Sequence, residues 1–209
     1  NIFKGAVGTC SIKVFNQIFA CCGLTEERAK QFGYNSASVV ISTYDRPDYH
    51  PDVKDLIAKL VYEKSSYRIL GLQLIGTGEV TRYIDSFSIF CQKEAVLYDL
   101  LEFEHAYTPT HSSPLNPLIN LASIAIMQEE NNLMCFPANL LSKFTGIIID
   151  LREKSEIKAE PLPVKAIEIS ISNIREKISD FNQREDILLI CQRGPRSFEV
   201  VCYFMQNGF

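Results

Sequence analysis

Apolar residues in the first 35 positions recur at the spacing that is typical of short helices. Residues 13–23, KVFNQIFACCG, predict one helix that ends at Gly23, because glycine readily adopts the left-handed conformation found at helix ends. The next stretch, LTEERAKQFG, predicts a second helix, with Thr25 as its N-cap and acidic residues in its first turn. Two short helices are therefore expected before residue 35.

Three stretches rich in β-branched and aliphatic residues follow and predict strands: NSASVVIST, KDLIAKLVYE and RILGLQLIG. The segment YDRPDYHPD, between the first two, holds two prolines and predicts a loop. Helical spacing returns in TRYIDSFSIFCQKE and again from residue 115 to residue 130. The first part of the chain therefore mixes strands and helices.

The pattern changes near Asn131, Asn132 and Pro137, which predict a linker. Beyond it, short apolar strands are expected in GIIID, VKAIEI and DILLIC. They alternate with helices expected in SNIREKISDF, capped by Ser172, and in RSFEVVCYFMQNG. Such alternation is typical of a parallel α/β sheet. We expect two domains, residues 1–132 and 133–209.

Composition narrows the class of protein. A formal net charge of −4 leaves no basic field for nucleic acid or an anionic membrane surface. No apolar run reaches the roughly 18 residues that a membrane span needs. Seven cysteines without a CxxC pair argue against a disulfide framework and a cysteine-based zinc site, and favour a reducing, cytoplasmic setting. Because the chain begins at Asn1 without an initiator Met, we expect it to be part of a longer protein.

The stretch ILLICQRGPRS, residues 187–197, is the strongest candidate for chemistry. A parallel strand would deliver Cys191 into a loop whose backbone amides and following helix N-terminus favour a thiolate, the nucleophilic form of cysteine. Arg193 and Arg196 would add positive charge, and Gly194 would let the loop curl around a sulfur or an anion. Ser197 completes the loop.

Two chemical interpretations compete with a purely structural one. Four residues separate Cys191 from Arg196 in this loop, one fewer than in a cysteine-based phosphatase loop, and the shorter ring suits a single sulfur better than a phosphate. The alternatives are a phosphatase or arsenate reductase, or a cysteine that is only the last core residue of its strand.

GIIIDLRE, followed by ILLICQRGPRS, resembles a rhodanese domain over residues 138–209. The resemblance implies an α/β fold with a parallel sheet and helices on both faces, Asp150 and Arg152 as a pair that frames the loop, and Cys191 as a persulfide carrier. In place of the family's usual Gly-His stretch the chain has KAEPLPVKAIE, and it stops at QNGF, so the domain is expected to be truncated at its C-terminus.

GAVGTCSIKVFNQIFACCGLTEERAKQFG, RILGLQLIG, RYID and YTPTHSSPLNPLIN resemble the dimerisation domain of the FAD-dependent pyridine nucleotide-disulfide oxidoreductases. The branch that they resemble contains coenzyme A disulfide and persulfide reductases fused to a rhodanese domain. This implies an α+β domain with an antiparallel sheet. It also places Tyr49 and Tyr107 where two tyrosines reach across a dimer toward coenzyme A and the partner's redox sulfur. Alternatively, Tyr49 is a surface aromatic and Tyr107 packs under its loop.

By resemblance, the whole enzyme is a homodimer that passes electrons from NAD(P)H through FAD to a small persulfide or coenzyme A disulfide. The FAD and NAD(P) domains would lie upstream, so no cofactor is expected to bind this chain alone, and GTGEV at Gly76 is too short for a dinucleotide loop. A non-catalytic dimerisation module remains the alternative. We expect His50, His105 and His111 to be loop residues rather than metal ligands, and Cys21 and Cys22 to pack on a helix.

Overall fold

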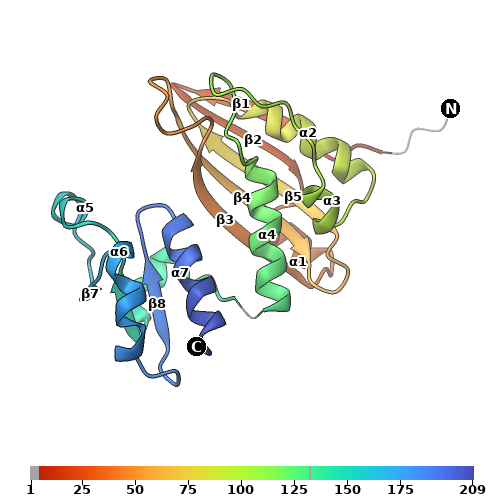
Figure 1. The fold of residues 1–209 in the computed structure, drawn as a ribbon. Coiled ribbons are helices and arrows are strands. Elements are labelled where there is room, and N and C mark those ends of the chain that lie inside the picture. The colour runs from red at the N-terminus through yellow and green to blue at the C-terminus, as the bar shows by residue number, and fades with distance from the viewer. Residues whose placement is uncertain (1–4, 132) are drawn as a thin grey trace. The chain divides into compact units, whose positions relative to one another are not determined.

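The computed structural model describes residues 5–131 and 133–209. The chain divides into two compact units, Asn1–Leu133 and Met134–Phe209, which are coloured from red to green and from green to blue in Figure 1. Asn132, where the sequence predicts the end of the first domain, lies outside the described residues.

An antiparallel sheet forms the first unit, in the strand order β1-β2-β5-β4-β3. Its strands are β1 (Cys10–Val14), β2 (Gln17–Gly23), β3 (Ser36–Tyr44), β4 (Asp55–Glu63) and β5 (Ile69–Gly76). Buried and more exposed positions alternate along the first half of β4, as expected when one face of a strand points into a core. The last three strands and the loop between β3 and β4 follow the sequence prediction.

Helices cover the sheet and build its core. They are α1 (Glu26–Gln31), α2 (Thr81–Gln92), α3 (Leu97–Leu101) and α4 (Pro117–Glu130). The helix α2 packs on β2 and β5, while α4 packs on β3 and β4, and Figure 1 shows both lying across the sheet. Fully buried Phe87 and Leu121 bring the two helices into one core with Leu60 of β4. The α+β architecture expected for this part is therefore confirmed.

The helix expected over residues 13–23 is wrong, because these residues form the end of β1, a turn and the strand β2, which pairs with β1 as a hairpin. Val14 pairs directly with Gln17, so only Phe15 and Asn16 form the turn, and Phe15 has a positive φ of 54°. Its β-branched and aromatic residues suit a strand, and a run this short fits both periodicities. Gly23 does not end a helix either. It has a φ of +76° and lies so close to β5 that an added Cβ would stand 2.2 Å from the Leu70 carbonyl oxygen.

The second unit is built on a small parallel sheet in the order β7-β6-β8. Its strands are β6 (Ile147–Asp150), β7 (Ile167–Glu168) and β8 (Ile187–Ile190). Its helices are α5 (Lys154–Ala159), α6 (Ile171–Ile174) and α7 (Pro195–Gln206), with 3₁₀ segments η1 (Ala138–Lys143) and η2 (Arg175–Asp180). Ile149, Leu189, Val200 and Phe204 form its core. The parallel sheet expected from the alternating pattern is confirmed.

Two details of this unit differ from the sequence prediction. The strand expected in VKAIEI is only two residues long. The helix expected from Ser172 begins after Ser170 and continues as a 3₁₀ segment. Neither difference changes the sheet that places Cys191 at the end of β8.

The close approach at Gly23 predicts a steric cost that can be separated from backbone strain. Gly33 also has a positive φ, +87°, but nothing lies within 4 Å of its added Cβ. Gly33→Ala should therefore lower the free energy of unfolding by about 1 kcal/mol, which is the cost of the left-handed conformation alone. Gly23→Ala should cost at least about 2 kcal/mol more, because its methyl group collides with backbone. Urea unfolding measures both, and equal losses would contradict the close packing of β2 on β5.

Candidate functional site

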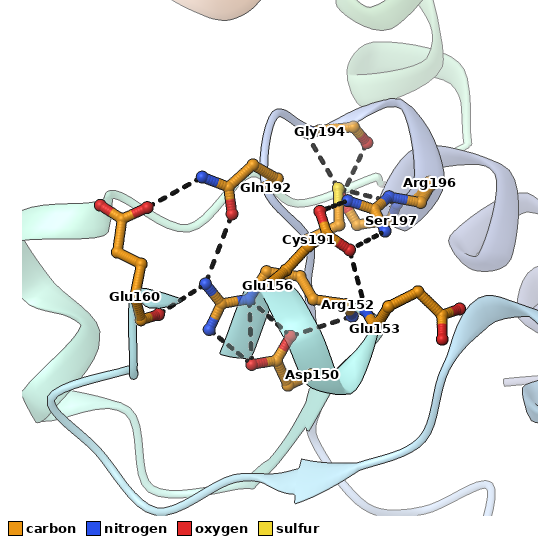
Figure 2. A network of polar contacts seen from close by, with 10 residues as sticks. All are labelled: Asp150, Arg152, Glu153, Glu156, Glu160, Cys191, Gln192, Gly194, Arg196 and Ser197. Carbon is orange, nitrogen blue, oxygen red and sulfur yellow. Dashed lines mark hydrogen bonds and ion pairs between the residues drawn. The ribbon is translucent and has the colours of Figure 1, made fainter. Parts of the chain in front are cut away.

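Cys191 follows directly after β8, and its side chain lies inside the turn that leads into α7. The backbone amide of Gly194 donates to Cys191 Sγ at 3.0 Å, and the amide of Ser197 donates at 3.4 Å. Gly194, with a φ of 110°, is the N-cap of α7. A positive φ at this position favours glycine, which turns the backbone amides inward. Figure 2 shows the sulfur enclosed by this turn.

The turn favours the thiolate through fixed dipoles. Burial raises the pKa of the Cys191 thiol, but a hydrogen bond between Cys191 Sγ and the Ser197 hydroxyl and those donated by the amides of Ser197, Arg193 and Gly194 outweigh burial, and the net pKa is lowered. The Ser197 hydroxyl also donates to the Gly194 carbonyl at 2.8 Å. Because a hydroxyl has one proton, the backbone amides are the constant donors to the sulfur.

The charge of Arg196 is directed to a carboxylate rather than to the sulfur. Its Nη1 and Nη2 atoms donate to the two carboxylate oxygens of Glu156 at 2.7 and 2.6 Å. This bidentate pair lowers the pKa of Glu156 to about 2. Figure 2 shows the pair beside Cys191. Arg196 therefore contributes at most a field that Glu156 largely neutralises, and no pattern in the sequence indicates this partner.

A second arginine joins the end of β6 to the cysteine turn. Asp150 and Arg152 are both buried, and Arg152 Nε and Nη2 donate to the Asp150 carboxylate at 2.9 and 2.8 Å. Arg152 Nη1 then donates to the Glu160 carbonyl at 2.8 Å and to Gln192 Oε1 at 3.4 Å. The pair thus connects β6, the end of α5 and the residue after Cys191, as Figure 2 shows.

In the first unit, the structure brings Tyr49 and Tyr107 together although 57 residues separate them in the sequence. Both side chains are exposed, at 73% and 48%. Partial desolvation and a hydrogen bond with the Tyr49 side chain raise the pKa of Tyr107. Two phenols side by side on the surface can donate hydrogen bonds to a thiolate or a carbonyl oxygen of a bound molecule.

Buried Asp45 holds the loops of the two tyrosines in place. It is 1% exposed, and its carboxylate accepts from Arg46 Nη2 at 2.8 Å and from the Lys54 amide at 2.9 Å, which closes the loop that contains Tyr49. Arg46 Nη1 donates to the Thr110 carbonyl at 2.9 Å, in the segment that follows Tyr107. A charged Asp-Arg pair directly after an apolar strand was the signal in the sequence for this brace.

The GTGEV turn between β5 and α2 is occupied by the side chain of Asp45. Asp45 Oδ2 accepts from the Glu79 amide at 3.2 Å, and an added Cβ at Gly78 would lie 2.1 Å from that oxygen. A carboxylate therefore occupies the position where a dinucleotide phosphate would need these amides. The residues of this turn do not fit FAD or NAD(P)H.

The remaining candidates form no metal site and no membrane span within the described residues. Over residues 5–131 and 133–209, no group of three or more potential metal ligands gathers, and His111 instead contacts Thr110 Oγ1 at 2.7 Å. No helix in the described ranges is long and apolar enough to cross a membrane. Cys21 and Cys22 lie on the strand β2, not on a helix.

Comparison with known proteins identifies the family. The pattern of the pyridine nucleotide-disulphide oxidoreductase dimerisation domain matches residues 9–118. The chain therefore belongs to this family.

Two curated relatives are an NADH oxidase from Mycoplasma genitalium, 34% identical over 117 residues, and a coenzyme A disulfide reductase from Staphylococcus aureus, 32% identical over 119 residues. These matches cover 54% and 57% of this chain, and 24% and 26% of the relatives. The chain thus spans about a quarter of each relative's length.

Two solved structures resemble the whole chain. An NAD-dependent persulfide reductase from A. fulgidus is 29% identical, with a TM-score of 0.86 over 100% of this chain and 38% of that chain. A reduced Bacillus anthracis protein, CoADR-RHD, has a TM-score of 0.91 and the same coverage at 24% identity, which is a likeness of fold. Both units of this chain therefore have counterparts in a larger protein.

The ion pair beside Cys191 predicts opposite effects of two substitutions. Glu156→Gln leaves the positive charge of Arg196 without its partner and should lower the pKa of Cys191 further. Arg196→Ala leaves the Glu156 carboxylate uncompensated and should raise the pKa of Cys191. Arg175→Ala, in an exposed pair with Glu199, is the matched control and should change nothing. The rate of Cys191 alkylation as a function of pH measures all three, and identical profiles would show that the arginine has no influence on the sulfur.

Asp45 predicts an acid-dependent loss of stability. Burial raises its pKa, but the hydrogen bonds from Arg46, Lys54 and Glu79 outweigh burial and hold it below its ordinary value. Its contribution is therefore complete above the unfolded pKa of about 3.9 and is lost as the pH falls through the folded pKa. Asp45→Asn should cost about 2–4 kcal/mol at neutral pH, and this deficit should shrink on acidification.

The matched control is Asp48→Asn, because Asp48 is an exposed aspartate of the same loop. It should alter neither the stability nor its pH dependence. Urea unfolding across a pH series measures both variants. A deficit of Asp45→Asn that stays constant down to acid pH would contradict the charged brace.

Proposed function

We propose that this chain is the C-terminal part of an NAD(P)H- and FAD-dependent reductase of coenzyme A disulfide or of persulfides. Residues 1–132 would form its dimerisation domain, and residues 133–209 a rhodanese-like domain in which Cys191 carries sulfane sulfur. The family of the first unit and the likeness of the whole chain to a persulfide reductase support the proposal. The FAD and NAD(P) domains would belong to the rest of the enzyme.

The observation on which the sulfur-carrier role depends is the turn around Cys191. Its amides donate to the sulfur and lower its pKa. The thiolate attacks the terminal sulfur of a persulfide, R–S–SH. A new S–S bond forms at Cys191, the old S–S bond breaks, and R–S⁻ leaves with the electron pair, so the transfer involves no net oxidation. The Cys191 persulfide then gives its proton to the departing R–S⁻, and the same amides stabilise the persulfide anion that results.

A sulfur carrier explains the loop better than a phosphatase or an arsenate reductase. Those enzymes need a guanidinium that grips a tetrahedral oxyanion. Arg196 is held bidentately by Glu156, and Arg152 by buried Asp150. An oxyanion would have to displace a carboxylate to bind Arg196, whereas a single sulfur needs only the amides that already point at it.

Tyr49 and Tyr107 would act at the reductase centre. In a homodimer they would reach toward coenzyme A and the redox sulfur of the partner subunit, where a phenol can stabilise a departing thiolate by donating a hydrogen bond. Their contact with each other and the brace of Asp45 and Arg46 support a shared role, because both hold the two phenols at one place.

Persulfide loading tests the sulfur-carrier role. The chain is incubated with a low-molecular-weight persulfide and mapped by peptide mass, and we expect one added sulfur atom on the peptide of Cys191. Cyanide should remove it as thiocyanate. Cys191→Ser should abolish both the added sulfur and the release of thiocyanate. The matched control is Cys202→Ser, because burial raises the pKa of the Cys202 thiol in the same unit, and this variant should retain both results.

Two outcomes would contradict this role. A chain that folds but accepts no sulfur on Cys191 would be a non-catalytic dimerisation module. Hydrolysis of an aryl phosphate that depends on Cys191 would instead indicate oxyanion chemistry. The reductase role is tested on the full-length protein, as oxidation of NAD(P)H that depends on coenzyme A disulfide or a persulfide and falls in Tyr49→Phe and Tyr107→Phe.

A further inference from the structure

Four of the seven cysteines gather around β2, on its two opposite faces. Cys21 and Cys22 are consecutive on this strand, so their side chains point to opposite sides of the sheet. Cys22 is fully buried and contacts Cys91 and Thr9. Cys21 is half-buried and lies opposite Cys10 of β1, which is exposed. Only the Cys10–Cys21 side of the strand is open to a reagent.

Cys10 and Cys21 lie in a geometry from which a disulfide can form. They are direct partners in the antiparallel register, and their Sγ atoms lie 3.2 Å apart. Directly paired residues have Cα atoms about 4.5–5.5 Å apart, within the range that a disulfide spans. The sulfurs need to approach by roughly 1 Å to reach bonding distance, without a change of register.

We propose that Cys10 and Cys21 form a reversible cross-strand disulfide on reaction with low-molecular-weight disulfides. This modification site is independent of Cys191 and of the tyrosines. Among the described strands, the edge strand β1 pairs only with β2, and all five of its residues are exposed. The disulfide therefore adds a covalent link between the edge strand and its neighbour, and its reduction removes that link while the backbone pairing remains.

The reaction proceeds by two thiol–disulfide exchanges. The Cys10 thiolate attacks the disulfide R–S–S–R, a mixed disulfide forms on Cys10, and the first R–S⁻ leaves and takes up a proton. Cys21 then attacks the Cys10 sulfur, loses its proton to solvent, and expels the second R–S⁻, which is protonated. Two protein thiols are oxidised by two electrons, and one reagent disulfide is reduced to two thiols.

The order of attack follows from the surroundings of the two thiols. Burial and the contact with Cys10 raise the pKa of Cys21 to about 11, which makes it the poorer first nucleophile. Cys22 is the chemical competitor, because hydrogen bonds from Cys91 and Thr9 lower its pKa to about 7 against the effect of burial. Its side chain is 0% exposed, however, so a bulky disulfide cannot reach it.

The test uses the full chain with Cys191→Ser as background, which removes the other activated thiol. Glutathione disulfide is the probe. We expect the loss of two titratable thiols and a dithiothreitol-sensitive link between the tryptic peptides 5–13 and 14–28. Cys22→Ser, the matched neighbour, should retain the link. Cys21→Ser should abolish it and leave glutathione trapped on Cys10.

Four results would overturn the proposal. In the first, Cys10 and Cys21 remain free thiols. In the second, each ends as a separate mixed disulfide without a link. In the third, the link is lost in Cys22→Ser but kept in Cys21→Ser, which would assign the reaction to Cys22. A link found only between two chains, as a disulfide-bonded dimer on a non-reducing gel, would likewise contradict a bond within one hairpin.

Discussion

In each unit, a buried aspartate at the end of a strand is paired with an arginine one or two residues further on. A buried carboxylate costs several kcal/mol unless it is paired and hydrogen-bonded. Asp45 and Asp150 meet this cost with Arg46 and Arg152. Each arginine has donors left over, and these reach the Thr110 carbonyl, 64 residues from Arg46, and the Glu160 carbonyl, 8 residues from Arg152. A local ion pair thereby fixes the long loops that present the candidate site residues.

Around Cys191, arginine–carboxylate pairs likewise support the structure, whereas uncharged backbone amides stabilise the reactive sulfur. Two of the arginines around the turn give their hydrogen bonds to carboxylates, Arg196 to Glu156 and Arg152 to Asp150. The thiolate is left to the amides of Gly194 and Ser197, which are uncharged and held by the start of α7. Dipoles fixed in this way need no reorganisation when the sulfur changes from thiol to thiolate to persulfide.

Much of the fold could be predicted from the sequence, because most of its elements have one dominant pattern. β4 combines β-branched residues with alternating burial, and α1 has its N-cap at Thr25, whose side chain accepts from the Arg28 amide. The segment from residue 13 to residue 23 could not be predicted, because Val14, Ile18 and Cys21 fit a helix as well as a hairpin. Its pairing with β5, in which Gly23 lies opposite Gly71 and close to the Leu70 carbonyl, decided the outcome.

The candidate site residues likewise fall into two groups: those that are neighbours in the sequence and those that only the fold brings together. Residues within one turn, from Cys191 to Ser197, could be identified together because the sequence places them together. Glu156 could not be linked to Arg196, nor Cys10 to Cys21, since such contacts depend on how strands and helices are arranged in space. The tyrosines came from family resemblance alone, and their brace through Asp45 appears only in the fold. Electrostatic partners are therefore where a sequence is least informative, and at Arg196 the partner changes the chemistry, because it turns an expected anion-binding charge into a structural one.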